Sequence, residues 1–221
     1  MYENLLCLPY FQGMSKDDIT AILDKVKLEF FSYGDKEVVR ERGDECNRFA
    51  LLTKGTIISE ATAPDGSYKI IEEHSAPLAI EPYSMFGYTT DYKRRYTSKG
   101  ESTLLAVDKN YFFSEFSKQS IFMLNFMNLI SRKVQLLEKS IWEETPTTIE
   151  GRIIKFIEQR CESRVGYKQL HIKMERLAEI LCETRLNVSK ALNSLQEQGL
   201  ITLSRKEIHI PRFEELLARG R

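Results

Sequence analysis

The chain has 221 residues, and 32 Lys and Arg balance 32 Asp and Glu, so its formal net charge is zero. A chain of this length can form one large domain or two ordinary ones, each with its own core. No apolar run approaches the ~18 residues of a membrane-spanning helix, and the N-terminal residues have neither a basic leader nor a signal-peptide core. These features argue against a membrane protein and a secreted one, and we expect a soluble, cytoplasmic protein.

The zero net charge conceals an asymmetry along the chain. Residues 147–221 hold 14 Lys and Arg against 10 Asp and Glu, a net of +4, which leaves residues 1–146 with 18 against 22, a net of −4. A basic C-terminal part joined to an acidic N-terminal part is typical of a DNA-binding domain attached to another module.

The four cysteines lie far apart and form no CxxC pair; they are Cys7, Cys46, Cys161 and Cys182. A disulfide framework, a tetrahedral zinc site and an iron–sulfur cluster all require more closely grouped ligands. We therefore predict free thiols in a reducing compartment and no metal site.

The first 110 residues predict short helices followed by strands. Ser15 is placed to cap a helix whose apolar residues share one face. From Phe30 to about Val107, short apolar stretches alternate with turns such as Arg42-Gly43-Asp44 and Ala63-Pro64-Asp65-Gly66, and Gly55 follows another stretch. Strands at this spacing, with Gly turns, predict a small all-β barrel or sandwich.

A long helix is predicted from Tyr111 to Glu144. Six of its apolar residues are spaced alternately by four and three, which is the seam of a two-stranded coiled coil; they are Met123, Met127, Ile130, Val134, Leu137 and Ile141. A second apolar stripe, from Phe122 to Leu136, lies beside this seam. One stripe can pack on the β domain and the other on a second copy, or both can be intramolecular core. A helix of some 30 residues spans about 45 Å, which favours a homodimer.

Residues 143–148 predict a hinge. Pro146 disfavours helix at Thr145, and Thr147 with Glu150 has the spacing of a capping box for a new helix. The chain is thus expected to divide into a β sensor domain at 1–110, a helix and hinge at 111–146, and a third domain at 147–221.

Residues 172–210 predict a helix, a tight turn, a second helix and a two-stranded ribbon. The second helix begins at Thr184, and no Asp or Glu occurs from Thr184 to Leu195, although 29% of all residues are charged. Its outer face is suited to phosphates and base edges. Gly199 ends it, and the ribbon turns at Ser204-Arg205-Lys206. This pattern favours a winged helix-turn-helix that binds DNA, against the alternative of two packed helices with an ordinary polar face.

The order of these elements resembles the Crp/Fnr family of bacterial transcription regulators over nearly the whole chain. Gly43, Gly55 and the Asp65-Gly66 turn fall where the family's β-roll turns lie, and Gly199-Leu200-Ile201 matches the link from recognition helix to wing. The resemblance implies an α+β fold: a β-roll that resembles a cyclic-nucleotide-binding domain, a long dimerisation helix and a C-terminal winged helix-turn-helix.

The resemblance also implies a recognition helix that starts near Thr184 and enters the major groove, with Arg185, Ser189 and Lys190 at positions that commonly touch bases or phosphates. Leu186 stands where many members carry a Glu that accepts from cytosine, and Lys190 where an Arg commonly reads guanine. Leu cannot hydrogen-bond a base and can contact only a thymine methyl. Lys lacks the two parallel N–H donors with which Arg binds guanine. We therefore predict that Arg185 reads a guanine, and Lys190 is the second candidate for this contact.

Four further cations are expected to bind phosphate rather than bases, which gives affinity without sequence information; they are Lys173, Arg176, Arg205 and Lys206.

In members that bind cyclic nucleotides, a Gly-Glu pair and an Arg followed by Ser or Thr hold the ligand. Here Tyr88 replaces the Glu, and Tyr96 separates Arg95 from Thr97. Classical cyclic AMP binding is therefore not expected. The candidate effector residues are Phe86, Gly87, Tyr88, Arg94, Arg95, Thr97 and Ser98, where the arginines either meet another anionic ligand or form a solvated loop.

Some family members sense gases with haem, and His74 is the candidate axial ligand here, against the alternative of a surface residue. His171 and His209 are predicted to be structural. The N-terminal cysteine cluster of oxygen-sensing members is absent, so the cofactor stays unknown.

We interpret the chain as a homodimeric regulator that binds double-stranded DNA at a palindromic site, with possible effector control from the β-roll, and that contacts RNA polymerase if it is an activator. The alternative is a ligand-binding module whose C-terminal domain contacts protein instead of DNA. An enzyme is the least favoured class, because the sequence has no nucleophile elbow, no P-loop and no metal-spaced His/Glu set, and no catalytic residue is assigned.

Overall fold

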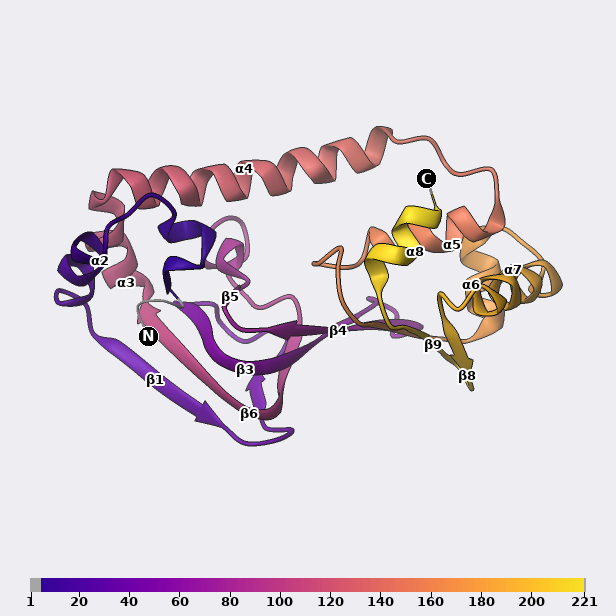
Figure 1. Ribbon diagram of the computed structural model, residues 1–221, viewed down its shortest axis with the longest axis horizontal. Helices are drawn as coiled ribbons and strands as arrows, with labels where there is room; N and C mark the ends of the chain where they lie inside the picture. The colour runs from indigo at the N-terminus through magenta and orange to yellow at the C-terminus, as the bar shows by residue number, and fades with distance from the viewer. Residues whose placement is uncertain (1–4, 221) are drawn as a thin grey trace. The chain divides into compact units, whose positions relative to one another are not determined.

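The computed structural model describes residues 5–220 and divides the chain into two compact units (Figure 1). The first consists of Met1–Ile57 and His74–Trp142, and the second of Ile58–Glu73 and Glu143–Arg221. The second unit thus contains a segment of the predicted β domain, which the sequence-based division at residues 110 and 146 did not include. No helix of the described residues is long and apolar enough to cross a membrane.

Short helices open the first unit. The 3-10 helix η1 (Pro9–Phe11) precedes α2 (Lys16–Leu23), and Ser15 caps α2 as predicted. The Asp18 amide donates to Ser15 Oγ at 3.1 Å, and the Ser15 amide donates to the Asp18 carboxylate at 3.0 Å. This reciprocal capping box holds the helix start, while Ile19 and Ile22 are buried beneath it.

Antiparallel strands form the rest of the first unit's β domain. β1 pairs with β6 over six residue pairs, β2 also pairs with β6, and β5 pairs with β3. The strand bounds are β1 (Leu28–Tyr33), β2 (Val38–Arg40), β3 (Arg48–Thr62), β5 (Leu78–Ile80) and β6 (Arg95–Asp108), and the 3-10 helix η2 (Pro82–Met85) follows β5.

The sequence predicted that Gly55 lies in a turn between two short strands. In the structure it lies inside the single strand β3. Its φ is +91°, and a Cβ atom there would lie 2.3 Å from the Glu101 carbonyl oxygen. The residue must therefore be glycine for two reasons, the left-handed backbone and the close approach of the neighbouring chain. With glycine at this position, β3 continues through the left-handed residue and is 15 residues long.

The predicted single helix from Tyr111 to Glu144 is wrong, because it is interrupted before Ser120. The structure instead has α3 (Lys109–Ser114), the 3-10 helix η3 (Phe116–Lys118) and α4 (Ser120–Trp142). The break brings Phe112, Phe116 and Phe122 into one aromatic cluster, with ring centroids 4.8–5.6 Å apart. Burying three aromatic rings together favours the break over a continuous helix, which would spread them along its axis.

The second unit begins after the hinge with α5 (Ile149–Glu158). Its cap is Thr148, whose Oγ1 accepts from the Gly151 amide at 3.1 Å, and not Thr147 as predicted. The capping box with Glu150 is therefore absent. Gly151 fits here because a Cβ atom would lie 2.7 Å from Pro146 Cβ.

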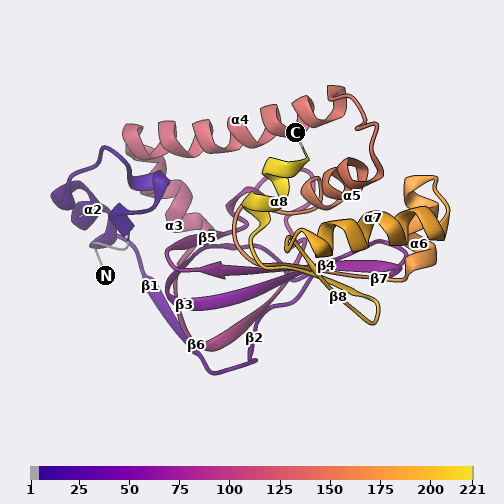
Figure 2. The same ribbon diagram turned by 45° about the vertical axis from the view of Figure 1, so that its right-hand side comes forward.

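Four neighbouring strands of the sheet and three more helices complete the second unit (Figure 2). The strand order is β4-β7-β9-β8, all antiparallel neighbours. β7 and α8 were not predicted from the sequence. The bounds are β4 (Tyr68–Ser75), β7 (Lys168–Ile172), α6 (Met174–Leu181), α7 (Arg185–Glu197), β8 (Thr202–Ser204), β9 (Glu207–Ile210) and α8 (Phe213–Arg219).

The core of this unit is formed in part by the apolar faces of its two central helices. In α6, Leu177 and Leu181 are buried, and Ile180 is half-buried against the same core. In α7, the buried residues are Val188, Ala191, Leu192 and Leu195. The helices therefore turn their remaining faces outward, and these faces carry the candidate site.

Candidate nucleic-acid interface

The turn between α6 and α7 is held by its backbone and by one ion pair. Cys182 ends α6 in the left-handed conformation with a φ of +53°, and Thr184 Oγ1 caps α7 by accepting from the Asn187 amide at 3.2 Å. Glu183, between them, pairs with the guanidinium of Arg152 from α5 and accepts from Asn187 Nδ2 at 3.2 Å. Hydrogen bonds from Arg152 and Asn187 hold the pKa of Glu183 below its usual range. The carboxylate thus fixes the start of α7 to the body of the domain.

The predicted recognition residues lie together at the outer face of α7. Leu186 has 64% of its surface exposed, and Lys190 is also exposed. Ser189 is half-buried on the same helix. An exposed leucine at the start of a helix gains nothing from the core, so the side chain is available to an apolar group such as a thymine methyl.

Arg185 does not extend freely from this face. Its Nη1 lies 2.9 Å from Glu175 Oε1 of α6, and both side chains are more than half exposed. The stretch without Asp or Glu in α7 is therefore complemented by a carboxylate from the neighbouring helix, which the pattern of α7 alone could not reveal. A carboxylate in this position orients the guanidinium and leaves its other N–H groups available.

The wing is the β8–β9 hairpin, with Arg205 and Lys206 in its turn, as predicted. Lys206 adopts a φ of +64° in this tight turn. Neither cation has an ion pair within the described residues. Both are therefore available to an anionic partner.

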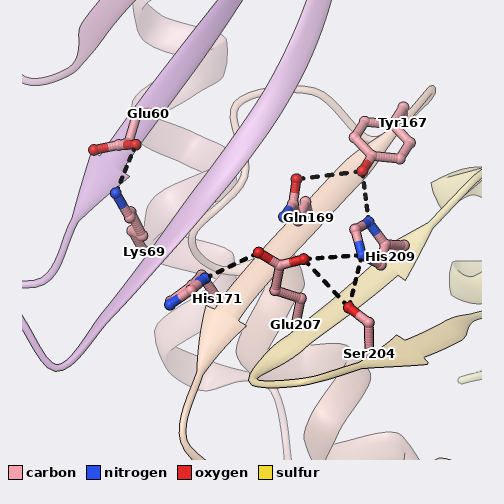
Figure 3. A network of polar contacts seen from close by, with 8 residues as sticks. All are labelled: Glu60, Lys69, Tyr167, Gln169, His171, Ser204, Glu207 and His209. Carbon is pink, nitrogen blue, oxygen red and sulfur yellow. Dashed lines mark hydrogen bonds and ion pairs between the residues drawn. The ribbon is translucent and has the colours of Figure 1, made fainter.

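A polar network joins the strands of the wing next to its turn (Figure 3). His209 Nε2 lies 3.1 Å from Ser204 Oγ and 3.2 Å from Glu207 Oε2, and the other carboxylate oxygen of Glu207 lies 3.4 Å from His171 Nδ1. Tyr167 reaches His209 Nδ1 at 2.8 Å. Both histidines thus bridge strands β7, β8 and β9, which agrees with the structural role predicted for them.

A cleft of about 440 Å³ lies between the start of α6, helix α7 and the wing. Apolar side chains such as Leu177 and Leu192 contribute to its lining, together with Lys173 and Lys206. The predicted DNA-contacting cations of α6 and of the wing therefore flank one concave surface.

Arg176 of α6 is held by other residues. Its guanidinium pairs with Asp65 at 2.9 Å and with Glu179 at 3.1 Å. It also donates to Ser67 Oγ at 3.2 Å.

The candidate effector residues do not converge on one another. Arg95 pairs with Glu41 at 3.2 Å, and Ser98 donates to the Gly100 carbonyl at 2.7 Å. Phe86 packs on the rings of Phe112 and Phe126. The remaining members are Gly87, with a φ of +105°, the fully exposed Tyr88, the half-buried Thr97, and Arg94.

Glu81 is the residue that organises this loop, and the sequence analysis did not identify it. The side chain is buried, and its carboxylate accepts from the amides of Lys93 and Arg94 at 2.8 and 3.0 Å. Ser84 Oγ and Tyr96 Oη also donate to it, at 2.8 and 3.0 Å. The chain's own carboxylate thus occupies backbone N–H groups of the kind that bind a phosphate.

His74, the candidate haem ligand, is buried, so the alternative of a surface residue is wrong. It does not line any of three cavities of about 440, 590 and 460 Å³ that the described residues form. All four cysteines are free, and no group of three or more His, Cys, Asp and Glu within residues 5–220 is arranged to hold a metal ion.

The predicted dimer seam on α4 is largely uncovered by its own unit. Met127, Val134, Leu137 and Ile141 expose 53–76% of their surface. Met123 and Ile130 instead pack partly against the core of the first unit, beside the buried Phe122 and Phe126. Of the second predicted stripe, Phe122 and Phe126 face the core, whereas Leu136 at its end is 48% exposed.

Comparisons with known proteins agree with this architecture. Residues 151–219 match the family model of the Crp-like helix-turn-helix domain. The chain is 22% identical over 233 aligned positions to the CRP-like cAMP-activated global transcriptional regulator of Mycobacterium tuberculosis, and the alignment covers 100% of both chains.

Two solved structures share the fold. The catabolite activator protein of Thermus thermophilus has a TM-score of 0.54 at 16% identity, over 96% of this chain and 98% of that one. The sensor domain of the transcriptional regulator DNR from Pseudomonas aeruginosa has a TM-score of 0.52 at 17% identity, over 66% of this chain and 95% of that domain.

A winged helix-turn-helix attached to an antiparallel β domain and a long helix defines a class of DNA-binding transcription regulators. The match over the helix-turn-helix, the full-length relative and the shared fold place this chain in that class. Residues 151–219 form a Crp-like helix-turn-helix domain, and over its full length the chain is similar to a CRP-like transcriptional regulator.

Proposed function

We propose that this regulator acts as a homodimer on a palindromic DNA site, with α7 in the major groove and the wing on the phosphate backbone. The observation that carries the proposal is the concave surface between α6, α7 and the wing, which is lined in part by Lys173 and Lys206. Leu186 and Lys190 are exposed on α7. Such a surface combines cations for phosphates with side chains for base edges. A protein that binds DNA must be in the compartment that contains the DNA, so we propose that it acts in the bacterial cytoplasm.

Dimerisation is proposed through α4. Four apolar side chains of the seam are exposed within the single chain, and an apolar stripe at this spacing is covered when two copies pair as a coiled coil. The two α7 helices of such a pair would meet half-sites about one helical turn apart. If the protein is an activator, RNA polymerase is a further partner.

The alternative is that the same surface binds a protein, and salt dependence distinguishes the two. Affinity for a DNA duplex should fall steeply with salt, because each neutralised phosphate releases counterions. Fluorescence anisotropy with a labelled duplex at several salt concentrations measures this slope. A flat dependence, or no binding at low salt, would favour the protein partner.

Arg185→Ala is expected to weaken binding to the preferred site by about 1–3 kcal/mol and to relax the preference at one base pair, because the guanidinium offers two donors to guanine. Competition with duplexes that differ at single base pairs measures this effect. Arg205→Ala is the matched control: it should weaken binding to all sequences nearly equally. Equal losses on every duplex for Arg185→Ala would contradict its assigned role.

We further propose that cyclic AMP is not the effector of this protein, although the relative from Mycobacterium tuberculosis is named as cAMP-activated. The support is Glu81, whose carboxylate already accepts from the two backbone amides and two hydroxyls of the loop. A second anion there would meet a buried negative charge at close range.

Cyclic AMP should accordingly leave both Tm and the Kd for DNA unchanged. Differential scanning fluorimetry over a concentration series measures the first, since a ligand of the native state raises Tm progressively. A cyclic-AMP-binding relative serves as positive control. A Tm that rises with cyclic AMP concentration would contradict the proposal.

A further inference from the structure

The hairpin of residues 58–73 is part of the second unit, although it lies within the sequence of the β domain. Its strand β4 pairs with β7 over five residue pairs, from Tyr68 opposite Ile172 to Glu72 opposite Lys168 (Figure 2). Ile70 is 1% exposed and belongs to the core of this unit. The sheet that carries the wing is therefore completed by a strand from far away in the sequence.

One end of this hairpin is held by buried contacts. Glu72 and Lys168 are both fully buried, and their charged atoms lie 2.9 Å apart. Glu72 also accepts from the amides of Glu162 and Ser163 at 2.8 and 3.2 Å. The Lys168 ammonium donates in addition to the Val165 carbonyl. An ion pair with this many hydrogen bonds in the interior breaks only at large cost.

The tip of the hairpin is held differently. Asp65 and Ser67 both contact the guanidinium of Arg176, at 2.9 and 3.2 Å. The Asp65 carboxylate is itself oriented by the Ser67 amide and hydroxyl, at 3.0 and 2.7 Å. The Asp65 and Arg176 side chains are 53% and 38% exposed, so solvent screens their attraction. Exposed pairs of this kind contribute little to stability.

The contacts at the tip resemble those of a phosphate group. A carboxylate oxygen and a hydroxyl oxygen approach two different nitrogens of one guanidinium, as two phosphate oxygens do. Arg176 is also one of the cations that the sequence predicts to bind the DNA backbone. The hairpin tip and a DNA phosphate would then require the same donors.

We propose that the tip of hairpin 58–73 is an internal competitor for a DNA phosphate. DNA takes over the guanidinium of Arg176 from Asp65 and Ser67, while the Glu72–Lys168 pair keeps the hairpin in the sheet. The hairpin thereby lowers the affinity for DNA. This inference rests on the proposed function, because it requires that Arg176 binds phosphate.

The test is a double-mutant cycle on the Kd for DNA at fixed salt. Asp65→Asn removes the competing charge and should tighten binding about two- to five-fold, in keeping with an exposed ion pair. The affinity for DNA should also fall more steeply with salt, because the Arg176 guanidinium then keeps one carboxylate partner, Glu179, instead of two. In an Arg176→Gln background, Asp65→Asn should leave the Kd unchanged.

Glu60→Gln is the matched control, because it removes one negative charge from the same hairpin at a pair with Lys69, which is not a predicted DNA contact. It should leave the Kd unchanged. Circular dichroism establishes that each variant is folded.

The possible failures can be told apart. If the wild type binds DNA but Asp65→Asn has the wild-type Kd, or if its gain persists with Arg176→Gln, the hairpin proposal is overturned and the proposed function stands. If neither the wild type nor any variant binds DNA, both are overturned.

Discussion

Glu72→Gln is expected to lower the free energy of unfolding of the second unit by about 3–5 kcal/mol, which is the usual cost of removing one partner from a buried pair. The amide has nearly the same volume as the carboxylate, but it leaves the ammonium of Lys168 fully buried without a counter-charge. Chemical denaturation followed by circular dichroism measures the change.

The same hairpin provides the control for this prediction. Glu60→Gln breaks the Lys69–Glu60 pair at 3.0 Å, whose side chains are 40% and 27% exposed, and it should cost less than about 1 kcal/mol. Replacing both buried charges, as in Glu72→Leu with Lys168→Met, should recover much of the lost stability, because no charge then stays unpaired. Equal stability of Glu72→Gln and Glu60→Gln would contradict the buried pair.

Val134→Glu is expected to dissociate the proposed dimer and to weaken DNA binding with it. In a coiled coil of α4 helices, the substitution buries two carboxylates near the two-fold axis, and burying an unpaired charge costs several kcal/mol. We expect the dimer Kd to rise about 100-fold or more, as a loss of about 3 kcal/mol implies. Sedimentation equilibrium measures the change.

Gln135→Glu is the control for the seam, since it places the same charge on the next residue, which the heptad spacing turns away from the partner. It should dimerise as the wild type does. Val134 is 58% exposed within the single chain, so its replacement should not unfold the first unit. A dimer unaffected by Val134→Glu would place the interface elsewhere.

Local sequence patterns predicted the recognition region well, because its determinants are close in sequence. The start of α7 near Thr184 and the turn at Arg205-Lys206 both lie within residues 184–206, and the structure confirms both. The four-three spacing in α4 also identified a seam of which four side chains are exposed, although Met123 and Ile130 pack partly against the core.

Features that depend on distant partners could not be predicted in this way. The sequence around Lys168 predicts an exposed cation. Its burial depends on Glu72, which comes from another part of the chain. The hairpin of residues 58–73 has the pattern of any β hairpin, and nothing local indicates that β4 pairs with β7, about one hundred residues later. The role of Glu81 likewise depends on the amides of Lys93 and Arg94, which donate to its carboxylate and lie more than ten residues later in the chain.

The aromatic break before α4 illustrates the same limit. The sequence predicts one helix from Tyr111 to Glu144, without an interruption before Ser120. Packing of Phe112, Phe116 and Phe122 in one cluster overrides that local preference.

Selection of bound duplexes from a random pool, with the purified protein at near-physiological salt and no added ligand, tests most directly whether α7 and the wing read DNA. We predict enrichment of a palindrome whose half-sites lie about one helical turn apart, and loss of one preferred base pair per half-site when the selection is repeated with Arg185→Ala. A pool that stays random after repeated rounds, with binding that does not depend on salt, would contradict the proposed DNA interface.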